Sequence, residues 1–142
     1  MEKMTPEETR EFLRAGTRTG KLATISADGS PHVAPIWFDL DVNGDLYFTT
    51  GETTVKGRNL RREPRMSLCV DDENPPFSYV LLFGVAEILE DPGALLKWTT
   101  ATGRRYMGED QAEDFGKRNA VEGELLVKLT PSKVVAHRNI AD

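Results

Sequence analysis

Cysteine and histidine are scarce in this 142-residue sequence, which has one cysteine, Cys69, and two histidines, His32 and His137. A lone cysteine excludes an internal disulfide and any zinc site built from several cysteines. Neither histidine has a partner at metal-ligand spacing, so structural or surface roles suit both. Cys69 lies in the alternating run RMSLCVD, which favours a packing residue over a nucleophile. We therefore predict no metal site.

Long apolar runs are also lacking, because no stretch approaches the roughly 20 residues that span a bilayer. The N-terminal residues MEKMTPEETREFL have no apolar signal-peptide core, so a cytoplasmic location is the simplest expectation. The formal net charge of −5 argues against nucleic-acid binding. A P-loop, a dinucleotide-binding GxGxxG motif, a Ser-His-Asp arrangement and a paired-carboxylate site are all missing, so no catalytic residue is assigned. The length predicts one domain over residues 1–142.

The pattern of the chain predicts a helix, then strands, then further helices before the closing strands. Thr5, Pro6 and Glu8 form the N-cap, first position and capping box of a helix that Gly16 stops. Alternation and turn signals predict strands over residues 21–26, 32–42, 45–50, 65–71, 79–89, 124–130 and 133–137. Further helices are expected over residues 53–63, 91–106 and 109–120.

This order predicts a mainly β fold with added helices. The first three strands form an antiparallel meander, and a turn at Pro131 separates the last two. Pro35 within the second strand indicates an edge or a bulge, because proline donates no ladder hydrogen bond. Gly84 is expected at a bend or barrel corner. Six or seven antiparallel strands, with helices at the N-terminus, after the third strand and before the closing strands, predict a closed or nearly closed barrel.

A basic segment follows the third strand and opens the second helix. Residues 49–65 hold five basic side chains against two acidic ones, and a strand-to-helix junction offers free N–H groups and a positive dipole to phosphate. Lys56 and Asn59 share a helix face, which Arg58 flanks. Alternatively, the segment is a solvated helix face, the threonines of TTGETT are strand-end and capping residues, and the bulky run PIWF is core.

Two segments together resemble a known family. One is A-P-I-W-F at residues 34–38, and the other is T-T-x-x-x-x-x-K-x-x-N-L-x-x-x-P from Thr49 to Pro64. In this order and spacing they resemble the split-barrel flavin and deazaflavin reductases related to pyridoxamine 5′-phosphate oxidase, and more closely the branch that uses coenzyme F420. The resemblance covers nearly the whole chain and implies a split β-barrel of the FMN-binding type.

The resemblance also implies roles for particular residues. The backbone from Val33 to Trp37 would face the ring of the cofactor, and Lys56 would bind its phosphate. Homodimers are implied, with sites at the subunit interface that the partner completes from its late helical region or closing strands. The implied cofactor-binding residues are Val33, Ala34, Pro35, Ile36, Trp37, Thr49, Thr50, Gly51, Lys56, Arg58 and Asn59.

The resemblance leaves two cofactors open. F420 carries a phosphodiester and a polyglutamate tail, which suit the extended row of Arg58, Arg61, Arg62 and Arg65 better than one terminal phosphate would. We therefore expect an F420-dependent oxidoreductase that passes a hydride to a conjugated small molecule such as a quinone, an enone or a tetrapyrrole like biliverdin. The alternatives are an FMN-dependent reductase or oxidase, and a non-catalytic cofactor- or tetrapyrrole-binding protein.

Overall fold

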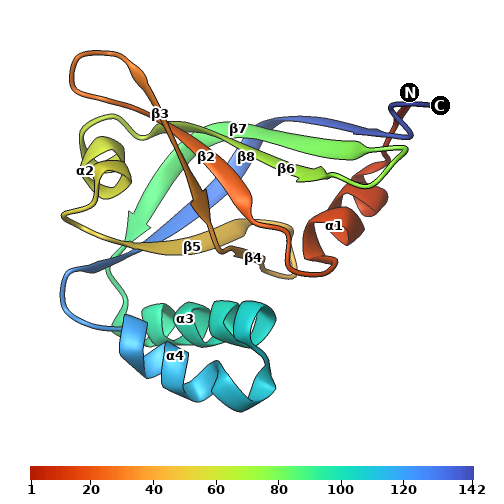
Figure 1. The fold of residues 1–142 in the computed structure, drawn as a ribbon. Coiled ribbons are helices and arrows are strands. Elements are labelled where there is room, and N and C mark those ends of the chain that lie inside the picture. Colours follow the sequence, from red (N-terminus) through yellow and green to blue (C-terminus); the bar gives the residue numbers. More distant parts are fainter.

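The computed structural model describes all 142 residues as an antiparallel half-barrel with four α-helices and one short 3₁₀-helix (Figure 1). The sheet has eight strands in the order β3-β2-β6-β7-β8-β5-β4, and β1 pairs with β8. The strands are β1 (Glu2–Lys3), β2 (Gly20–Ile25), β3 (Pro31–Ile36), β4 (Asp39–Leu40), β5 (Leu46–Gly51), β6 (Arg65–Asp72), β7 (Ser78–Leu89) and β8 (Glu124–Arg138). The helices are α1 (Pro6–Arg14), α2 (Val55–Arg62), α3 (Pro92–Met107), η1 (Glu109–Gln111) and α4 (Ala112–Asn119).

The sheet curls because its two end strands are neighbours in the chain. β3 ends at Ile36 and β4 begins at Asp39, yet these strands occupy opposite ends of the pairing order. Trp37 and Phe38 alone connect them. The predicted single strand over residues 32–42 is therefore wrong, because it breaks into two. The two antiparallel pairings expected of the meander do occur, β2 with β3 and β4 with β5, but they lie at opposite ends of the sheet. The physical reason is that side chains of α3 bind the backbone of Phe38 in place of a neighbouring strand.

β8 also differs from the expectation, because it runs through Pro131 as one strand of 15 residues. Its pairing with β7 shifts between Phe83 and Gly84, which brings Gly84 opposite Pro131. A bulge tolerates a proline that cannot donate to the ladder. The expected turn at Pro131 is therefore wrong, whereas the expected irregularity at Gly84 is confirmed.

The helix ends follow the capping signals in the sequence. Thr5 and Glu8 form a capping box at the start of α1, and Asp91 caps α3. Pro35 lies on β3, the end strand of the pairing order, as its missing N–H predicts. The short strand β1 was not expected.

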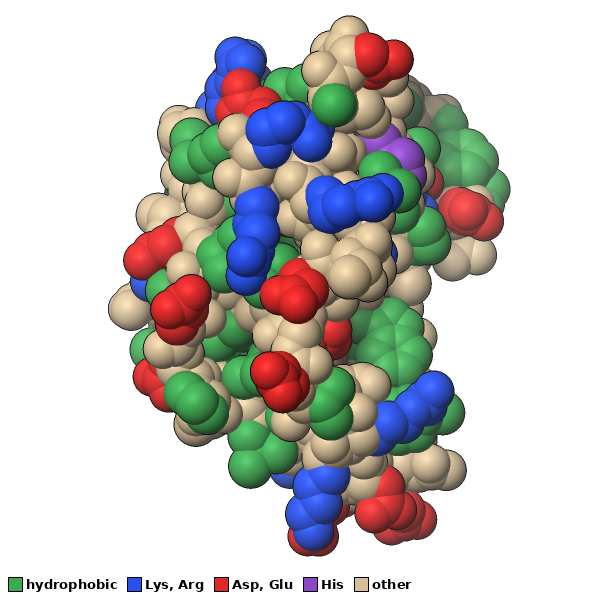
Figure 2. Space-filling view, turned by 90° about the vertical axis from the view of Figure 1, so that its left-hand side faces the viewer, with side chains coloured by type: hydrophobic (Ala, Val, Ile, Leu, Met, Phe, Trp, Pro, Cys, Tyr) green, Lys and Arg blue, Asp and Glu red, His purple; other side chains and the backbone are tan.

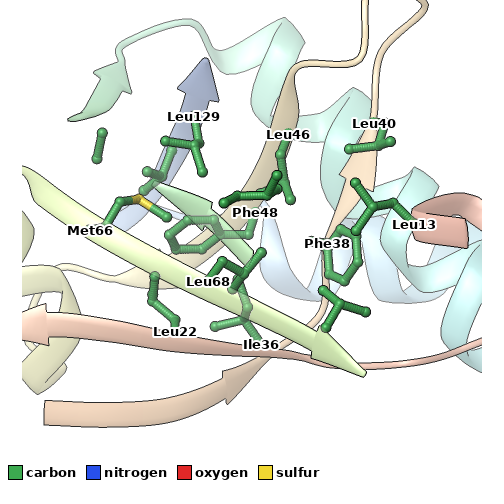
Figure 3. Close-up of a cluster of buried hydrophobic side chains, with 14 of the residues drawn as sticks. Leu13, Leu22, Ile36, Phe38, Leu40, Leu46, Phe48, Met66, Leu68 and Leu129 are labelled. Carbon is green, nitrogen blue, oxygen red and sulfur yellow. The ribbon is translucent and has the colours of Figure 1, made fainter. Parts of the chain in front are cut away.

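The main core fills the inside of the curled sheet (Figure 3). Phe38 and Phe48 are fully buried there, and Leu13 of α1 closes one side. Around them pack leucines such as Leu22, Leu68 and Leu129, which come from β2, β6 and β8. Figure 3 shows Phe38 beside Leu13 in this core.

The helices α3 and α4 form a hairpin against β5 and β4 (Figure 1). Arg105 of α3 holds this hairpin to the barrel. Its guanidinium donates to the carbonyl oxygens of Leu13 at 2.7 Å, Gly16 at 3.0 Å and Phe38 at 2.8 Å. A second, smaller core lies beneath, where Tyr47 of β5 stacks on Trp98 of α3 at 4.1 Å. No helix is both long and apolar enough to cross a membrane.

Candidate functional site

A pocket of about 220 Å³ opens where β3 ends, β5 ends and α2 begins, facing the α3–α4 hairpin. It brings together five of the residues expected to bind a cofactor, which come from two separate motifs: Pro35, Ile36, Trp37, Thr49 and Lys56. Thr102 of α3, Asn119 of α4 and Glu124 of β8 complete the lining. The two motifs therefore form one site in the folded chain.

One wall of the pocket is aromatic. Trp37 leaves the end of β3 and stacks on Tyr106 of α3, with ring centroids 5.1 Å apart and planes 5° apart. The Tyr106 hydroxyl donates to the carbonyl oxygen of Arg18 at 2.9 Å, and burial raises the pKa of Tyr106. Phe115 packs on Trp37 at 5.9 Å. The indole is thus held in place by α3 and α4 and offers a flat apolar surface to a ring system.

The free edge of β3 adjoins this wall. β3 pairs only with β2, so the backbone groups along its other edge have no strand partner. Pro35 and Val33 point to the outer face, where Val33 is 67% exposed, whereas Ala34 and Ile36 point inward. Val33 and Ala34 do not line the pocket in one chain. An unpaired edge can still present N–H and C=O groups to a ligand.

The turn from β5 into α2 fixes the position of Lys56. Thr54 is the N-cap of α2, and its hydroxyl accepts from the N–H of Gly57 at 3.1 Å. The hydroxyl of buried Thr50 lies 2.9 Å from that of Thr54. A Cβ on Gly57 would overlap the carbonyl oxygen of Gly51, so only glycine fits there. Thr50 and Gly51 thus build the turn without lining the pocket, and the capping interpretation of these threonines is confirmed for Thr54.

Lys56 and Glu124 are the charged residues of the pocket. Lys56 forms none of the nine salt bridges in the chain. Burial raises the pKa of Glu124, although its interactions with the Thr49 hydroxyl and the Lys56 charge act in the opposite direction. The pocket therefore holds a free cation beside a carboxyl group that gives up its proton reluctantly.

The remaining residues of the basic segment are mostly engaged with their own chain. Asn59 is buried, donates to the Thr24 hydroxyl at 3.0 Å and accepts from Arg62 at 2.9 Å. Arg61 pairs with Glu52 at 3.7 Å and Arg65 with Glu63 at 2.6 Å. Figure 2 shows basic side chains interspersed with acidic ones on the α2 side of the molecule. Arg58 is exposed and lies outside the pocket.

The sequence did not point to Thr102, Asn119 or Glu124. The expectation was that the late helical region or closing strands of a partner chain contribute to the site, and these residues come from those segments of the same chain. Glu124 offered one signal, since it is a carboxylate at the start of an apolar strand. That signal points to the pocket only once β8 is known to pair with β5, because this pairing places Glu124 opposite Gly51.

Larger hollows lie elsewhere on the chain. The largest, about 510 Å³, lies between α1 and β8 and contains none of the expected residues. The 220 Å³ pocket remains the better candidate because it combines an aromatic wall, an unpaired cation and a helix N-terminus.

An antiparallel half-barrel with such a pocket defines a class of cofactor-binding proteins. Residues 5–137 match the family described as pyridoxamine 5′-phosphate oxidase, so the chain belongs to that family. It is similar to a conserved hypothetical protein, Rv2991, from Mycobacterium tuberculosis, with 28% identity, a TM-score of 0.83, and 96% of this chain and 86% of that chain covered.

Two other solved structures are similar in fold. One, named F420 reductase, is 28% identical, with a TM-score of 0.66 and 87% of this chain and 94% of that chain covered. The other is the heme storage protein HutZ from Vibrio cholerae, with 20% identity, a TM-score of 0.73 and 96% and 98% covered. The split-barrel fold predicted from the sequence is thereby confirmed.

Proposed function

We propose that this protein is an F420-dependent oxidoreductase that reduces a conjugated small molecule. The observation that carries the proposal is the joining of the Trp37 surface to the unpaired Lys56 in one pocket. Reduced F420 supplies a hydride to the acceptor. The chain itself binds and orients: Lys56 and the start of α2 hold phosphate, while the free edge of β3 faces the ring. The similarity to an F420 reductase supports this choice.

The acceptor class in this proposal follows from what hydride transfer requires. A hydride acceptor must lie flat against the ring of the cofactor, so a planar conjugated molecule fits best. Quinones, enones and tetrapyrroles such as biliverdin meet this requirement. The pocket contains no tyrosine or histidine that could serve as a proton donor, which leaves water or Glu124 as the nearby proton source in one chain.

FMN is the alternative cofactor, and one observation favours it. Arg61, Arg62 and Arg65 contact Glu52, Asn59 and Glu63, so fewer free cations are left for a polyglutamate tail than the sequence suggested. A single phosphate on Lys56 needs no such row. An FMN-dependent reductase or oxidase on the same fold therefore remains the second candidate.

Storage of haem or another tetrapyrrole without turnover is the third candidate. Similarity in fold to a heme storage protein suggests this candidate. However, no histidine, cysteine, methionine or tyrosine lines the pocket. Those are the usual axial ligands of haem iron. A haem bound here would need a ligand from another chain.

We also propose that the protein works as a homodimer with the site at the subunit interface. The pocket of about 220 Å³ in one chain is smaller than the roughly 300–1,000 Å³ of typical ligand sites. The outer face of the sheet carries partly exposed apolar side chains on β7, which β2 and β6 separate from β3; they include Leu81, Phe83 and Val85. A second copy on this face would cover the apolar surface and complete the pocket.

Titration of ligand-free protein with F420, and separately with FMN, tests the proposal by fluorescence. We expect F420 to bind with micromolar or tighter affinity and FMN to bind more weakly. Preference for FMN would instead identify the second candidate. If neither binds, the redox function is wrong, although the fold stands.

A further inference from the structure

The pocket proposed to hold phosphate also contains a carboxyl group. Glu124 lines it together with Thr49 and Lys56, and its position is fixed because Glu124 pairs with Gly51 across the β5–β8 ladder. A phosphate bound by Lys56 therefore lies next to Glu124. A site for anions gains nothing from a second negative charge, so this carboxyl group needs a different explanation.

The charges around Glu124 leave Lys56 as its one opposing cation. The other pocket residues, from β3, β5, α3 and α4, are uncharged. On its other side, Glu124 borders a hollow of about 460 Å³ whose charged residues are Arg61 and the acids Glu52, Glu90, Asp91 and Glu122. Glu52 already neutralises Arg61 at 3.7 Å. Burial opposes a negative Glu124 and raises the pKa of the group, whereas the Thr49 hydroxyl and the Lys56 charge favour the negative form.

An anion on Lys56 increases this opposition in proportion to its own charge. A phosphate monoester carries about −1.5 to −2 at pH 7, whereas a phosphodiester carries a single charge. A charged Glu124 must therefore weaken the binding of a monoester more than that of a diester. Protonation of Glu124 removes the penalty, and by linkage ligand binding then promotes proton uptake.

We propose that Glu124 is a specificity-determining residue that selects ligands with a singly charged phosphate diester over those with a doubly charged monoester. This rests on the proposed function, since it assumes that Lys56 holds the phosphate of F420 or FMN. Glu124 acts on the charge of the ligand, so its effect is greatest at alkaline pH, where the carboxylate is ionised. The effect disappears at acidic pH, where the carboxyl group is protonated.

The experiment compares the wild-type chain with Glu124→Gln, which keeps the shape and removes the charge. Dissociation constants for FMN, F420 and riboflavin are measured by fluorescence between pH 5.5 and pH 8.5. Riboflavin carries the ring of FMN without phosphate. Because the ionisation of the FMN phosphate is the same for both chains, the ratio of their dissociation constants isolates Glu124. Glu122→Gln removes an equal charge two residues away, outside the pocket, and is the matched control.

We expect Glu124→Gln to tighten FMN binding about tenfold at pH 8.5, within the usual range of site coupling. F420 binding should tighten less, about threefold, because a diester carries less charge than a monoester. Both gains should shrink as the pH falls from 8.5 to 5.5, since protonation of the wild-type carboxyl group removes its charge. Riboflavin binding to Glu124→Gln, and binding of all three ligands to Glu122→Gln, should change less than about twofold. Thermal melts confirm that both variants fold.

A ratio that stays constant with pH, or FMN binding that weakens in Glu124→Gln, would overturn the inference while leaving the proposed function intact. Equal gains for FMN and F420 would also refute selection by charge. If neither the wild-type chain nor the variant binds FMN or F420 at any pH, the proposed function fails and the role of Glu124 falls with it.

Discussion

Lys56 is the residue on which phosphate binding in the pocket should depend most. Its ammonium group lines the pocket beside Glu124 and forms no salt bridge, so Lys56→Ala removes the one cation of the pocket. We expect cofactor binding to weaken by about 1–3 kcal/mol, the usual contribution of a charged hydrogen bond. The control is Lys117→Ala, which removes an exposed lysine paired with Glu113 on α4. Equal losses in both variants, measured by fluorescence titration, would contradict the assignment.

The sequence predicted which residues lie near the site better than it predicted where their side chains point. Lys56 and Asn59 were expected on one helix face, yet Lys56 reaches the pocket and Asn59 turns to Thr24 beneath the helix. Helical spacing relates residues to one another but does not state which face meets the sheet. The part played by Asn59 and Arg58 in cofactor binding stays a prediction, as does that of Val33 and Ala34. Glu124 could not be predicted, since it joins the site only through the pairing of β8 with β5.

Among the elements, the α3–α4 hairpin depends on one arginine for its attachment to the barrel. The guanidinium of Arg105 donates hydrogen bonds to three carbonyl oxygens: that of Leu13 in α1, that of Gly16 just after α1, and that of Phe38. Arg105→Ala removes these hydrogen bonds and leaves only the Tyr106 hydroxyl, at 3.4 Å, on the Phe38 carbonyl, so we expect unfolding free energy to fall by about 2–3 kcal/mol. Arg104→Ala is the matched control, because its exposed pair with Glu109 contributes at most about 1 kcal/mol. Urea unfolding measures both, and a similar small loss would show that Arg105 is no anchor.

The same contacts explain which elements the sequence could predict. Local signals, such as the Thr5 capping box and Pro92 after Asp91, placed the helices well because capping depends on near neighbours. The break between β3 and β4 depends on Arg105 and Tyr106, which lie more than 60 residues away. No alternation pattern contains that information. Likewise, Pro131 marks a turn in isolation and is accommodated because β8 bulges at Ser132 beside it, where its register with β7 shifts.

At the scale of the whole molecule, the outer face of the sheet should form the homodimer interface. Val85 lies on this face and is 58% exposed, so Val85→Glu adds a charge that a lone chain tolerates and an interface does not. We expect the dimer to dissociate at least about tenfold more readily, since burying a carboxylate at an interface is costly even with Arg65 opposite it on β6. Val42→Glu changes a valine that is 93% exposed on another part of the surface and should leave assembly unchanged. Sedimentation across a range of concentrations measures both variants, and a wild-type chain that stays monomeric would refute the dimer.

Because the pocket in one chain is small for a cofactor, Val85→Glu should also lose cofactor affinity as it becomes monomeric, whereas unchanged affinity would show that a single chain suffices.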